Sequence, residues 1–486
     1  MTSFHTFTDD ALGTHDAVGL TSAMAAGDVS PKEVVEAALD RADTAGPVLN
    51  AVVERIDDRA REAAAAARPG EGVFAGVPTF IKDTDPVEGL PNRIGSRAMP
   101  TTPAEESSPF VRNYETTGVV ILGTTTLPEF GLTGSTEPLL TGTTRNPWSL
   151  DHSTGGSSGG SAALVAAGVV PIAHANDGGG SIRIPASCCG LVGLKPSRGR
   201  IPQLEVPAPL DIVGNAVVSR SVRDTAAYFH GAEQAHAPEH LPRIGHVTAP
   251  TDECLRVGLY AEGPDGRRFD SRSVDEAERI AAELESLGHH VERIPCPFDA
   301  QAMDDFILYW SMTPALLYRA GKRVFGPDFD RDAFEPWTRY LIRYFNRRAP
   351  KAPAAIRRLR KLEAQYRARF DELDLFLSPT TGAPVHEIGF LDPTLPGDVH
   401  LQRVFQLFPV TPFHNAVGAP GISLPLGTTS AGLPLGIHLA ADVGREQLLL
   451  EVALQLEEAH GWARCRATPA SAVSARCADR SGGVGQ

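Results

Sequence analysis

The sequence predicts an α/β fold in which helices cover one large, mainly parallel β-sheet. The first observation is that short apolar runs, typical of buried strands, alternate along the chain with segments of helical periodicity. Alternation of this kind favours a sheet covered by helices. The second is that no stretch of linker composition interrupts residues 1–465. We therefore expect a single domain over that range.

The first hundred residues show the pattern α-α-β-α-β. Ser30 and Glu33 form a capping box with Pro31 at the first helical position, which predicts that a helix begins there. A further helix is predicted over residues 57–67. Residues 76–83 form a short apolar run that leads to a polar turn, so a buried strand is predicted at this position.

The same alternation continues to the end of the predicted domain. Residues 131–161 hold few charges and many Gly, Ser and Thr residues, which predicts an ordered loop. Helices are predicted from about residue 108, at 274–287, over most of 299–370 and at 446–460, and strands at 119–122, 255–260, 291–294 and 375–377.

Composition excludes several classes of function. The 486 residues include 45 Lys and Arg and 59 Asp and Glu, so the net charge is −14. This charge argues against a general affinity for nucleic acid or membranes. The basic segment 347–369 is interpreted as the solvated face of a helix. Six scattered cysteines and the lack of a signal peptide indicate a reducing compartment, so we expect a cytoplasmic protein. Residues 466–486 are predicted to be a disordered tail.

Two glycine-serine segments are candidates for the chemistry. Residues 155–161 are Gly-Gly-Ser-Ser-Gly-Gly-Ser, and residues 177–185 are Asp-Gly-Gly-Gly-Ser-Ile-Arg-Ile-Pro. Consecutive N–H groups without side chains above them bind anions, as an oxyanion hole requires. Ser181 ends such a run and is placed to attack a carbonyl group. For either segment alone, a tight turn with structural glycines is an equal alternative.

Other nucleophile arrangements fit the sequence less well. Residues 155–159 match the G-x-S-x-G nucleophile elbow, which would need a histidine base downstream. His414 and His438 are the candidates, and neither lies in a context that marks it. A Ser-x-x-Lys pair is excluded, because no lysine has a serine three residues before it.

Neither a metal nor a cofactor is predicted. His236 and His240 have the spacing of metal ligands, but Pro238 between them argues against a shared helical face. Residues 70–75 match a dinucleotide-binding pattern only formally, because they follow a helix rather than a strand.

Taken together, the motifs resemble the amidase signature family. The likeness covers nearly all of residues 10–465, and the segments that carry it are 76–78 with Lys82 and Asp83, 155–161, 177–185, 189–196, 374–379, 418–421, 436–437 and Glu446. The resemblance implies the family's fold, a single large mixed β-sheet with helices on both faces. It also implies an amidase, which hydrolyses carbon–nitrogen bonds other than peptide bonds.

The resemblance assigns a role to each matching position. Ser181 falls at the nucleophile, Lys82 at the base, and Ser157 at the bridging serine, whose preceding peptide bond is cis in the family. The backbone N–H groups of the oxyanion hole fall at Gly178, Gly179, Gly180 and Ser181. Positions that support the reacting groups fall at Ser158, Asn176, Asp177 and Arg183.

The chemistry of a lysine base requires burial. A free lysine has a pKa near 10.4 and is protonated at pH 7, whereas burial can lower that pKa by several units. Lys82 follows the apolar run 77–81, which predicts a buried position. Asp83 would oppose the shift if it pointed inward, so we expect its carboxylate to point away.

The sequence departs from the family pattern beside the nucleophile. The usual Thr-Asp-Thr-Gly-Gly-Ser becomes Asn-Asp-Gly-Gly-Gly-Ser at 176–181, similar to the branch that includes 6-aminohexanoate cyclic-dimer hydrolase. The extra glycine leaves the triad intact and is expected to alter the adjoining pocket wall. The aromatic residues between 306 and 344 are predicted to line that pocket or a subunit contact, and a hydrophobic acyl or amine group is the expected ligand.

Two alternatives stay open. One is a glutamine-hydrolysing A subunit of a tRNA-dependent amidotransferase, against which the altered segment 176–180 argues. The other, from a different class, is an inactive binding or scaffold protein, against which the complete set of Lys82, Ser157 and Ser181 argues. The expected partner is a small-molecule amide, and a homodimer is compatible with the sequence.

Overall fold

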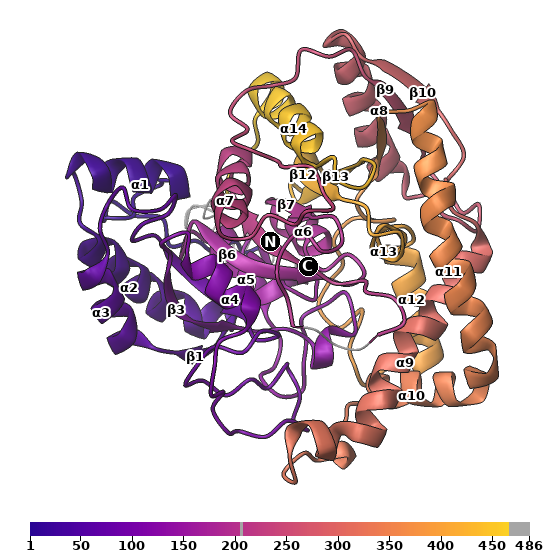
Figure 1. Cartoon of the computed structure of the whole chain (residues 1–486), viewed down its shortest axis with the longest axis horizontal. Helices are drawn as coiled ribbons and strands as arrows, with labels where there is room; N and C mark the ends of the chain where they lie inside the picture. Colours follow the sequence, from indigo (N-terminus) through magenta and orange to yellow (C-terminus); the bar gives the residue numbers. More distant parts are fainter. Residues whose placement is uncertain (205–207, 466–486) are drawn as a thin grey trace, which may run out of the picture.

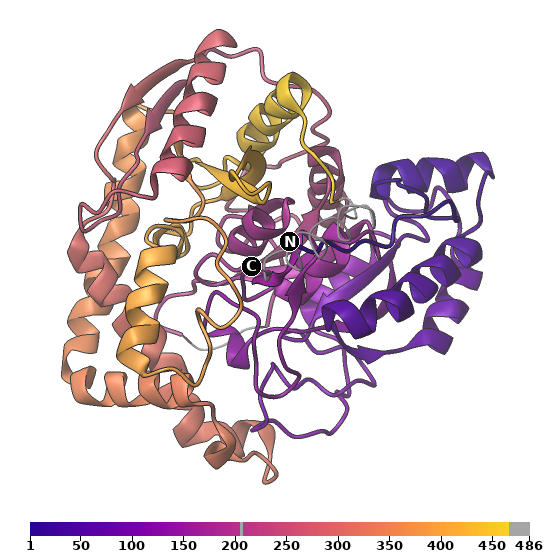
Figure 2. The same ribbon diagram turned by 180° about the vertical axis from the view of Figure 1, so that it is seen from behind.

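The computed structural model describes residues 1–204 and 208–465, so the predicted tail lies outside the described residues. Figures 1 and 2 show the chain from two opposite sides. Its largest sheet has eight strands. They are β6 (Ile172–Asp177), β7 (Val192–Lys195), β8 (Gly214–Ser219), β9 (Arg256–Leu259), β10 (His290–Arg293), β11 (Leu375–Pro379), β12 (Gly421–Thr428) and β13 (Pro434–Ala440).

The strand order is β10-β9-β11-β13-β12-β7-β8-β6. Only β9 pairs in parallel with its two neighbours, and the remaining pairs are antiparallel. The predicted α/β fold with a large mixed sheet is confirmed, but the expectation of a mainly parallel sheet was wrong. One reason is the hairpin of β12 and β13, which lies between β7 and β11 and pairs antiparallel with both. The other is β8, which pairs antiparallel with β7 and with β6.

A second sheet carries the first strands of the chain. β1 (Val52–Arg55), β3 (Val120–Thr125) and β2 (Pro78–Lys82) form it in that order. Hydrogen bonds join β2 to β6 at the edge of the large sheet; among them, Lys82 N–H donates to His174 Nδ1 at 3.1 Å, and Thr79 Oγ1 donates to the Ile172 carbonyl at 3.0 Å. Lys82 therefore lies at the seam between the two sheets.

The N-terminal helices follow the predicted order along the chain. They are α1 (Ala17–Ala26), α2 (Pro31–Leu49), α3 (Asp57–Ala66) and α4 (Pro109–Glu115), so the predicted α-α-β-α-β order is confirmed. The capping box is formed, since the Ser30 hydroxyl accepts from Glu33 N–H and the Glu33 carboxylate accepts from Ser30 N–H.

The helices that cover the large sheet fall into two kinds. All residues of α5 (Gly159–Ala166) and α6 (Arg183–Cys189) are buried. In contrast, the longer helices bury one face and leave the other in solvent; these are α7 (Val222–Ala235), α8 (Ser271–Ser286) and α14 (Glu446–His460). The sequence predictions for α8 and α14, and for strands β2, β3, β9, β10 and β11, are confirmed.

A helical layer forms one side of the molecule, opposite α1–α3 (Figure 1). It contains α9 (Ala300–Phe325), α10 (Pro336–Arg348), α11 (Ala352–Arg367) and α12 (Gly397–Leu407), which confirms the predicted helical region 299–370. α9 packs against α10 and α11, and it also contacts the short helix α13 (Thr411–Ala416). Through α13 the layer approaches the turn that holds Ser181.

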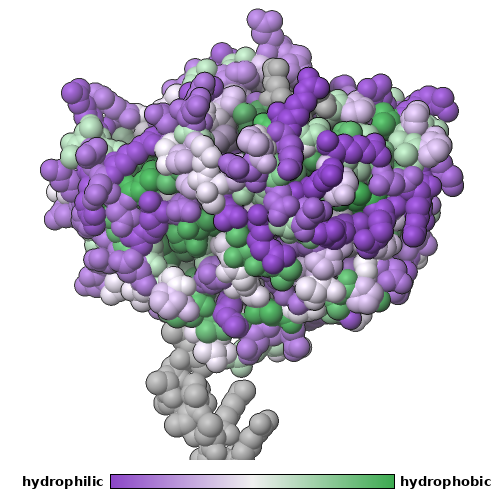
Figure 3. All heavy atoms as spheres, turned by 90° about the horizontal axis from the view of Figure 1, so that it is seen from below, coloured by the Kyte–Doolittle hydropathy of each residue, from purple (hydrophilic) through white to green (hydrophobic). Residues whose placement is uncertain are grey.

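One face of the molecule can be followed in a space-filling view (Figure 3). Hydrophilic side chains dominate the face that is seen from below, and hydrophobic residues gather there only in small groups (Figure 3). In the described ranges, none of the helices has the length and apolar character needed to cross a membrane.

Candidate active site

Lys82 is the last residue of β2, a strand whose five residues are all buried. Its Nζ atom donates to Ser157 Oγ at 2.7 Å and to Asn176 Oδ1 at 2.6 Å. Burial lowers the pKa of Lys82 to about 7, although the nearby Asp177 and Asp85 carboxylates act in the opposite direction. The predicted burial is confirmed, and a large share of the amine is neutral at pH 7.

The Asp83 carboxylate points away from this amine, as expected. It accepts from Asn92 Nδ2 at 3.2 Å and from Arg93 N–H at 3.3 Å. Burial raises the pKa of Asp83 to about 7, which further reduces its negative charge. Asp83 therefore does not hold the Lys82 amine in its charged form.

Ser157 lies just before α5, and the Gly156–Ser157 peptide bond is cis, as the resemblance implies. Close packing requires the glycine at 156, because a Cβ atom there would lie 2.5 Å from the Ser135 carbonyl oxygen. Gly131 faces Ser157 from a neighbouring loop, where a Cβ atom would lie 3.2 Å from Ser157 Oγ. The next residue, Ser158, donates to the Asn176 carbonyl at 3.2 Å.

Ser181 lies in the glycine turn between β6 and α6, and the Asp177 carboxylate organises this turn. That carboxylate accepts from Gly180 N–H at 2.6 Å, from Ile182 N–H at 3.1 Å and from Arg183 Nε at 2.9 Å. Burial alone would raise the pKa of Asp177, but the Arg183 guanidinium holds it well below its usual range. An ionised carboxylate thus fixes the backbone on both sides of Ser181.

Hydrogen bonds with two residues of α13 also support the turn. Arg183 Nη2 donates to the Thr411 carbonyl at 2.9 Å and to Asn415 Oδ1 at 2.8 Å, while Asn415 Nδ2 donates to the Asp177 carbonyl at 2.6 Å. Thr411 and Asn415 were not predicted. No motif marks them in the sequence, and more than 200 residues separate them from Asp177.

The N–H groups of the turn divide into two kinds. Gly180 N–H is occupied by Asp177, so it is not free to bind an anion. Those of Gly178, Gly179 and Ser181 have no acceptor within residues 1–204 and 208–465. Exposure rises from 0% at Lys82 to 2% at Ser157 and 7% at Ser181, so a molecule from solvent reaches Ser181 first.

A hydrogen-bonded chain extends behind Lys82. Asn176 Nδ2 donates to Thr84 Oγ1 at 2.8 Å, and Thr84 Oγ1 donates to Asp85 Oδ2 at 3.3 Å. Burial raises the pKa of Asp85 to about 6, against the effect of the Lys82 charge. Burial also lowers the pKa of His174 to about 3, so this imidazole is neutral. No sequence motif assigned Thr84, Asp85 or His174 to this site.

The histidines considered as alternative bases lie elsewhere. His438 Nε2 is 3.3 Å from Arg183 Nη1, and the His414 and His438 ring centroids are 4.8 Å apart. Burial lowers both pKa values well below the usual range. In the described part of the chain neither imidazole contacts Ser157 or Ser181. Among the described residues, no group of three or more His, Cys, Asp or Glu side chains is placed to bind a metal ion.

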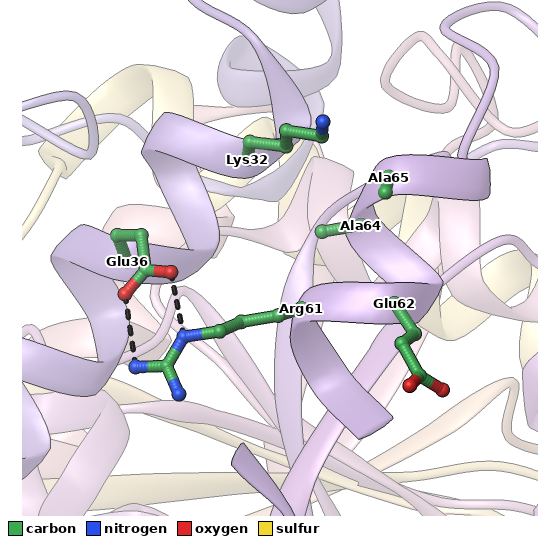
Figure 4. A pocket seen from close by; sticks show the side chains of 6 residues that line it. All are labelled: Lys32, Glu36, Arg61, Glu62, Ala64 and Ala65. Atoms are coloured by element: carbon green, nitrogen blue, oxygen red, sulfur yellow. Dashed lines mark hydrogen bonds and ion pairs between the residues drawn. The ribbon is translucent and has the colours of Figure 1, made fainter. Parts of the chain in front are cut away.

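One hollow of the surface lies apart from these groups, between α2 and α3 (Figure 4). Arg61 and Glu36 form an ion pair across it, with 2.7 Å between Nε and Oε1. None of the residues that line this hollow belongs to the candidate site. They are Lys32, Glu36, Arg61, Glu62, Ala64 and Ala65.

The chain that carries this buried lysine and these two serines is similar to known proteins over most of its length. The family model named Amidase matches residues 33–450. The chain belongs to the amidase family. It is accordingly an enzyme that hydrolyses carbon–nitrogen bonds other than peptide bonds, as the sequence predicted.

Individual amidases and their structures show the same relationship. "Putative amidase AmiC" of Mycobacterium tuberculosis is 45% identical over 96% of this chain and 99% of its own. The 6-aminohexanoate-cyclic-dimer hydrolase of Paenarthrobacter ureafaciens is 34% identical over 92% and 95%. A solved structure of a 6-aminohexanoate cyclic dimer hydrolase has a TM-score of 0.85 at 32% identity over 94% and 98%. A bacterial aryl acylamidase structure has a TM-score of 0.82 at 28% identity over 92% and 96%.

Proposed function

We propose that this amidase hydrolyses a small carboxylic amide, linear or cyclic, through an acyl-enzyme on Ser181. The observation that carries the proposal is the 2.7 Å contact between Lys82 Nζ and Ser157 Oγ in a fully buried setting. A neutral amine beside a hydroxyl group can accept its proton, and Ser157 can then accept the proton of the Ser181 hydroxyl.

In the first half of the reaction, Ser181 Oγ attacks the amide carbonyl carbon while its proton passes through Ser157 to Lys82. The carbonyl oxygen becomes negative and is stabilised by the free N–H groups of Gly178, Gly179 and Ser181. The carbon–nitrogen bond then breaks. The amine leaves with the proton that the relay returns, and the acyl group stays on Ser181.

In the second half, water replaces the amine. It attacks the ester carbonyl and gives its proton to the same relay, and the carboxylic acid leaves as Ser181 Oγ regains a proton. Asp177, Arg183 and Ser158 take no part in bond making in this scheme. They support the turn and the neighbouring loop.

Two observations support a substrate with a hydrophobic acyl or amine part. Phe306 and Trp310 of α9 lie beside the glycine turn. The names of similar proteins, a cyclic-dimer hydrolase and an aryl acylamidase, also refer to substrates with hydrocarbon parts. The single domain over 1–465, the cytoplasmic location and a homodimer stay predictions.

The test measures amine and ammonia release from aliphatic amides, aryl amides and glutamine. Ser181→Ala should abolish release while its circular dichroism spectrum stays unchanged, and mass spectrometry of the wild-type enzyme should find the acyl adduct on Ser181. Undiminished turnover by Ser181→Ala would refute the assignment. Ammonia from glutamine only with partner subunits would favour the amidotransferase alternative, and no turnover of any amide the scaffold alternative.

A further inference from the structure

Trp310 of α9 spans the space between the two loops of the candidate site. A Cβ atom at Gly178 would lie 3.2 Å from Trp310 Cζ3 and 3.4 Å from Cη2. At the other edge of the ring, Trp310 Nε1 donates to the Leu132 carbonyl at 3.4 Å. Leu132 follows Gly131, which faces Ser157 Oγ. The indole thus runs from the turn before Ser181 to the loop beside Ser157.

The surroundings of this indole are apolar and partly open. The Phe306 ring stacks on it with 5.8 Å between centroids, and a Cβ atom at Gly179 would lie 3.7 Å from Phe306 Cζ. The Cβ atom at Gly178 would also lie 3.7 Å from Val213 Cγ2, and Val213 is 38% exposed. Trp310 itself is half-buried. A partly exposed aromatic side chain therefore lies beside the glycine turn that holds Ser181.

Gly178 is matched to this indole. Its φ lies outside the left-handed region, so the backbone would accept another residue there. The limit comes from space, because the Cγ and Oγ atoms of a threonine would extend beyond a Cβ atom that already lies 3.2 Å from the ring. This is the position at which the sequence replaces the family's usual threonine.

We propose that Trp310 and Gly178 together form the wall that binds the hydrophobic group attached to the scissile amide. The ligand is an alkyl or aryl group, which lies on the indole while the carbonyl sits at Ser181. Gly178 keeps the indole in place because it has no side chain. The proposal rests on the proposed function, since that function places the scissile carbonyl at Ser181.

Two substrate series test the wall, and both begin with N-methylacetamide. In the acyl series, N-methylhexanamide and N-methylbenzamide enlarge the acid part. In the amine series, N-hexylacetamide and acetanilide enlarge the amine part. Trp310→Ala should lower kcat/KM for the large members of one series roughly tenfold or more and change N-methylacetamide by about twofold at most. The affected series identifies the group that contacts the indole.

Trp337 provides the matched control. Its Nε1 donates to the same Leu132 carbonyl at 3.0 Å, but its side chain is only 3% exposed and belongs to the core. Trp337→Phe should therefore affect all substrates alike. An equal loss on small and large substrates in Trp310→Ala would give Trp310 the same structural role and overturn the proposal, as would no loss at all.

A double mutant tests the match between the two residues. Gly178→Thr should lower kcat/KM for the same large substrates, and Trp310→Ala added to it should cause little further loss, because the threonine has already displaced the indole. Such non-additivity is expected where two side chains compete for one space. Independent, additive losses would contradict the proposed match.

Binding to Ser181→Ala separates this proposal from the proposed function. Calorimetry would measure the Kd of N-methylhexanamide and N-hexylacetamide without turnover. A Kd that rises roughly tenfold in Ser181→Ala/Trp310→Ala supports the wall even if the wild-type enzyme hydrolyses neither amide, an outcome that would count only against the proposed function. An unchanged Kd, or no binding to Ser181→Ala, would overturn the wall.

Discussion

Two lysines in this chain are buried at strand ends, and they differ in their neighbours. Lys82 ends β2 and Lys195 ends β7, with exposures of 0% and 2%. Burial lowers both pKa values to about 7. The charge of Arg183 lowers the pKa of Lys195 further, while Asp177 and Glu446 raise it.

The difference lies in what each amine contacts. Lys82 Nζ contacts the Ser157 hydroxyl, which has a proton to give. Lys195 Nζ donates to the Pro196 carbonyl oxygen at 2.6 Å, and that oxygen carries no proton. Burial therefore lowers the pKa of the amine at both places, but only Lys82 has a hydroxyl neighbour from which it could take a proton in the proposed reaction. A lowered lysine pKa by itself does not identify a catalytic group.

The largest expected effect separates the two lysines by activity. Lys82→Met should lower kcat roughly a thousandfold, because the relay loses its proton acceptor. Lys195→Met should retain kcat within about fivefold, since no step of the proposed reaction uses this amine. Steady-state hydrolysis by both variants at pH 8 provides the measurement. Equal losses in the two variants would remove the distinction drawn here.

The pH profile tests the protonation state of the base. The proposed reaction requires neutral Lys82, and burial lowers its pKa to about 7, so kcat/KM should fall about tenfold per pH unit below pH 7 and level off above it. The Lys195→Met profile should have the same midpoint. A shifted midpoint in that variant would show that Lys195 controls the fall of kcat/KM below pH 7.

Asn176 sharpens the contrast, because it supplies a neutral acceptor to Lys82. Asn176→Asp would place a carboxylate where Oδ1 now lies, 2.6 Å from Lys82 Nζ, and should raise the lysine pKa by about 1 to 3 units. The acid limb of kcat/KM should move to higher pH by the same amount. Asn176→Ala is the control, and its limb should show no upward shift even if its rate falls.

The smallest expected effect concerns the stability that Lys195 controls. The folded protein holds Lys195 neutral above pH 7, whereas the unfolded chain stays protonated up to a pKa near 10.5. The free energy of unfolding should therefore rise with pH across this window, by at most about 1.4 kcal/mol per pH unit for each such lysine.

Lys195→Met should reduce that slope relative to the wild-type protein. Urea unfolding at pH 7.5 and pH 9.5 measures it, and comparison of the two proteins isolates Lys195 from the other buried groups that titrate. Identical slopes would place the pKa of Lys195 close to its unfolded value.

The sequence was sufficient where local chemistry decides the structure. The capping box at Ser30 predicts the start of a helix from a few neighbouring residues. In the same way, the apolar run before Lys82 predicts a buried strand and a buried position for Lys82 at its end. The direction of the strands could not be predicted in this way. It depends on where β12 and β13 insert, and periodicity distinguishes strands from helices without giving their partners.

The same division applies to the candidate site. The motifs indicated Lys82, Ser157 and Ser181, and the structure brings Lys82 into contact with Ser157. Asn176 was predicted to support the reacting groups, but its contact with Lys82 could not be predicted, because that contact depends on how β6 lies against β2. Trp310 is one of several aromatic residues between 306 and 344, and the sequence does not distinguish which of them lies near the site. The packing of α9 places Trp310 beside Gly178.

The central hairpin also affects how the chain is made. Lys195 in β7 pairs with Gly421 in β12, about 226 residues later. At roughly 5 to 20 residues per second, a ribosome adds β12 some 10 to 45 seconds after β7. During that interval β7 lacks one of its two neighbours, and an unpaired apolar edge attracts other chains. The protein therefore depends on its last strands for safe folding, and truncation before β12 should yield aggregates rather than a smaller stable domain.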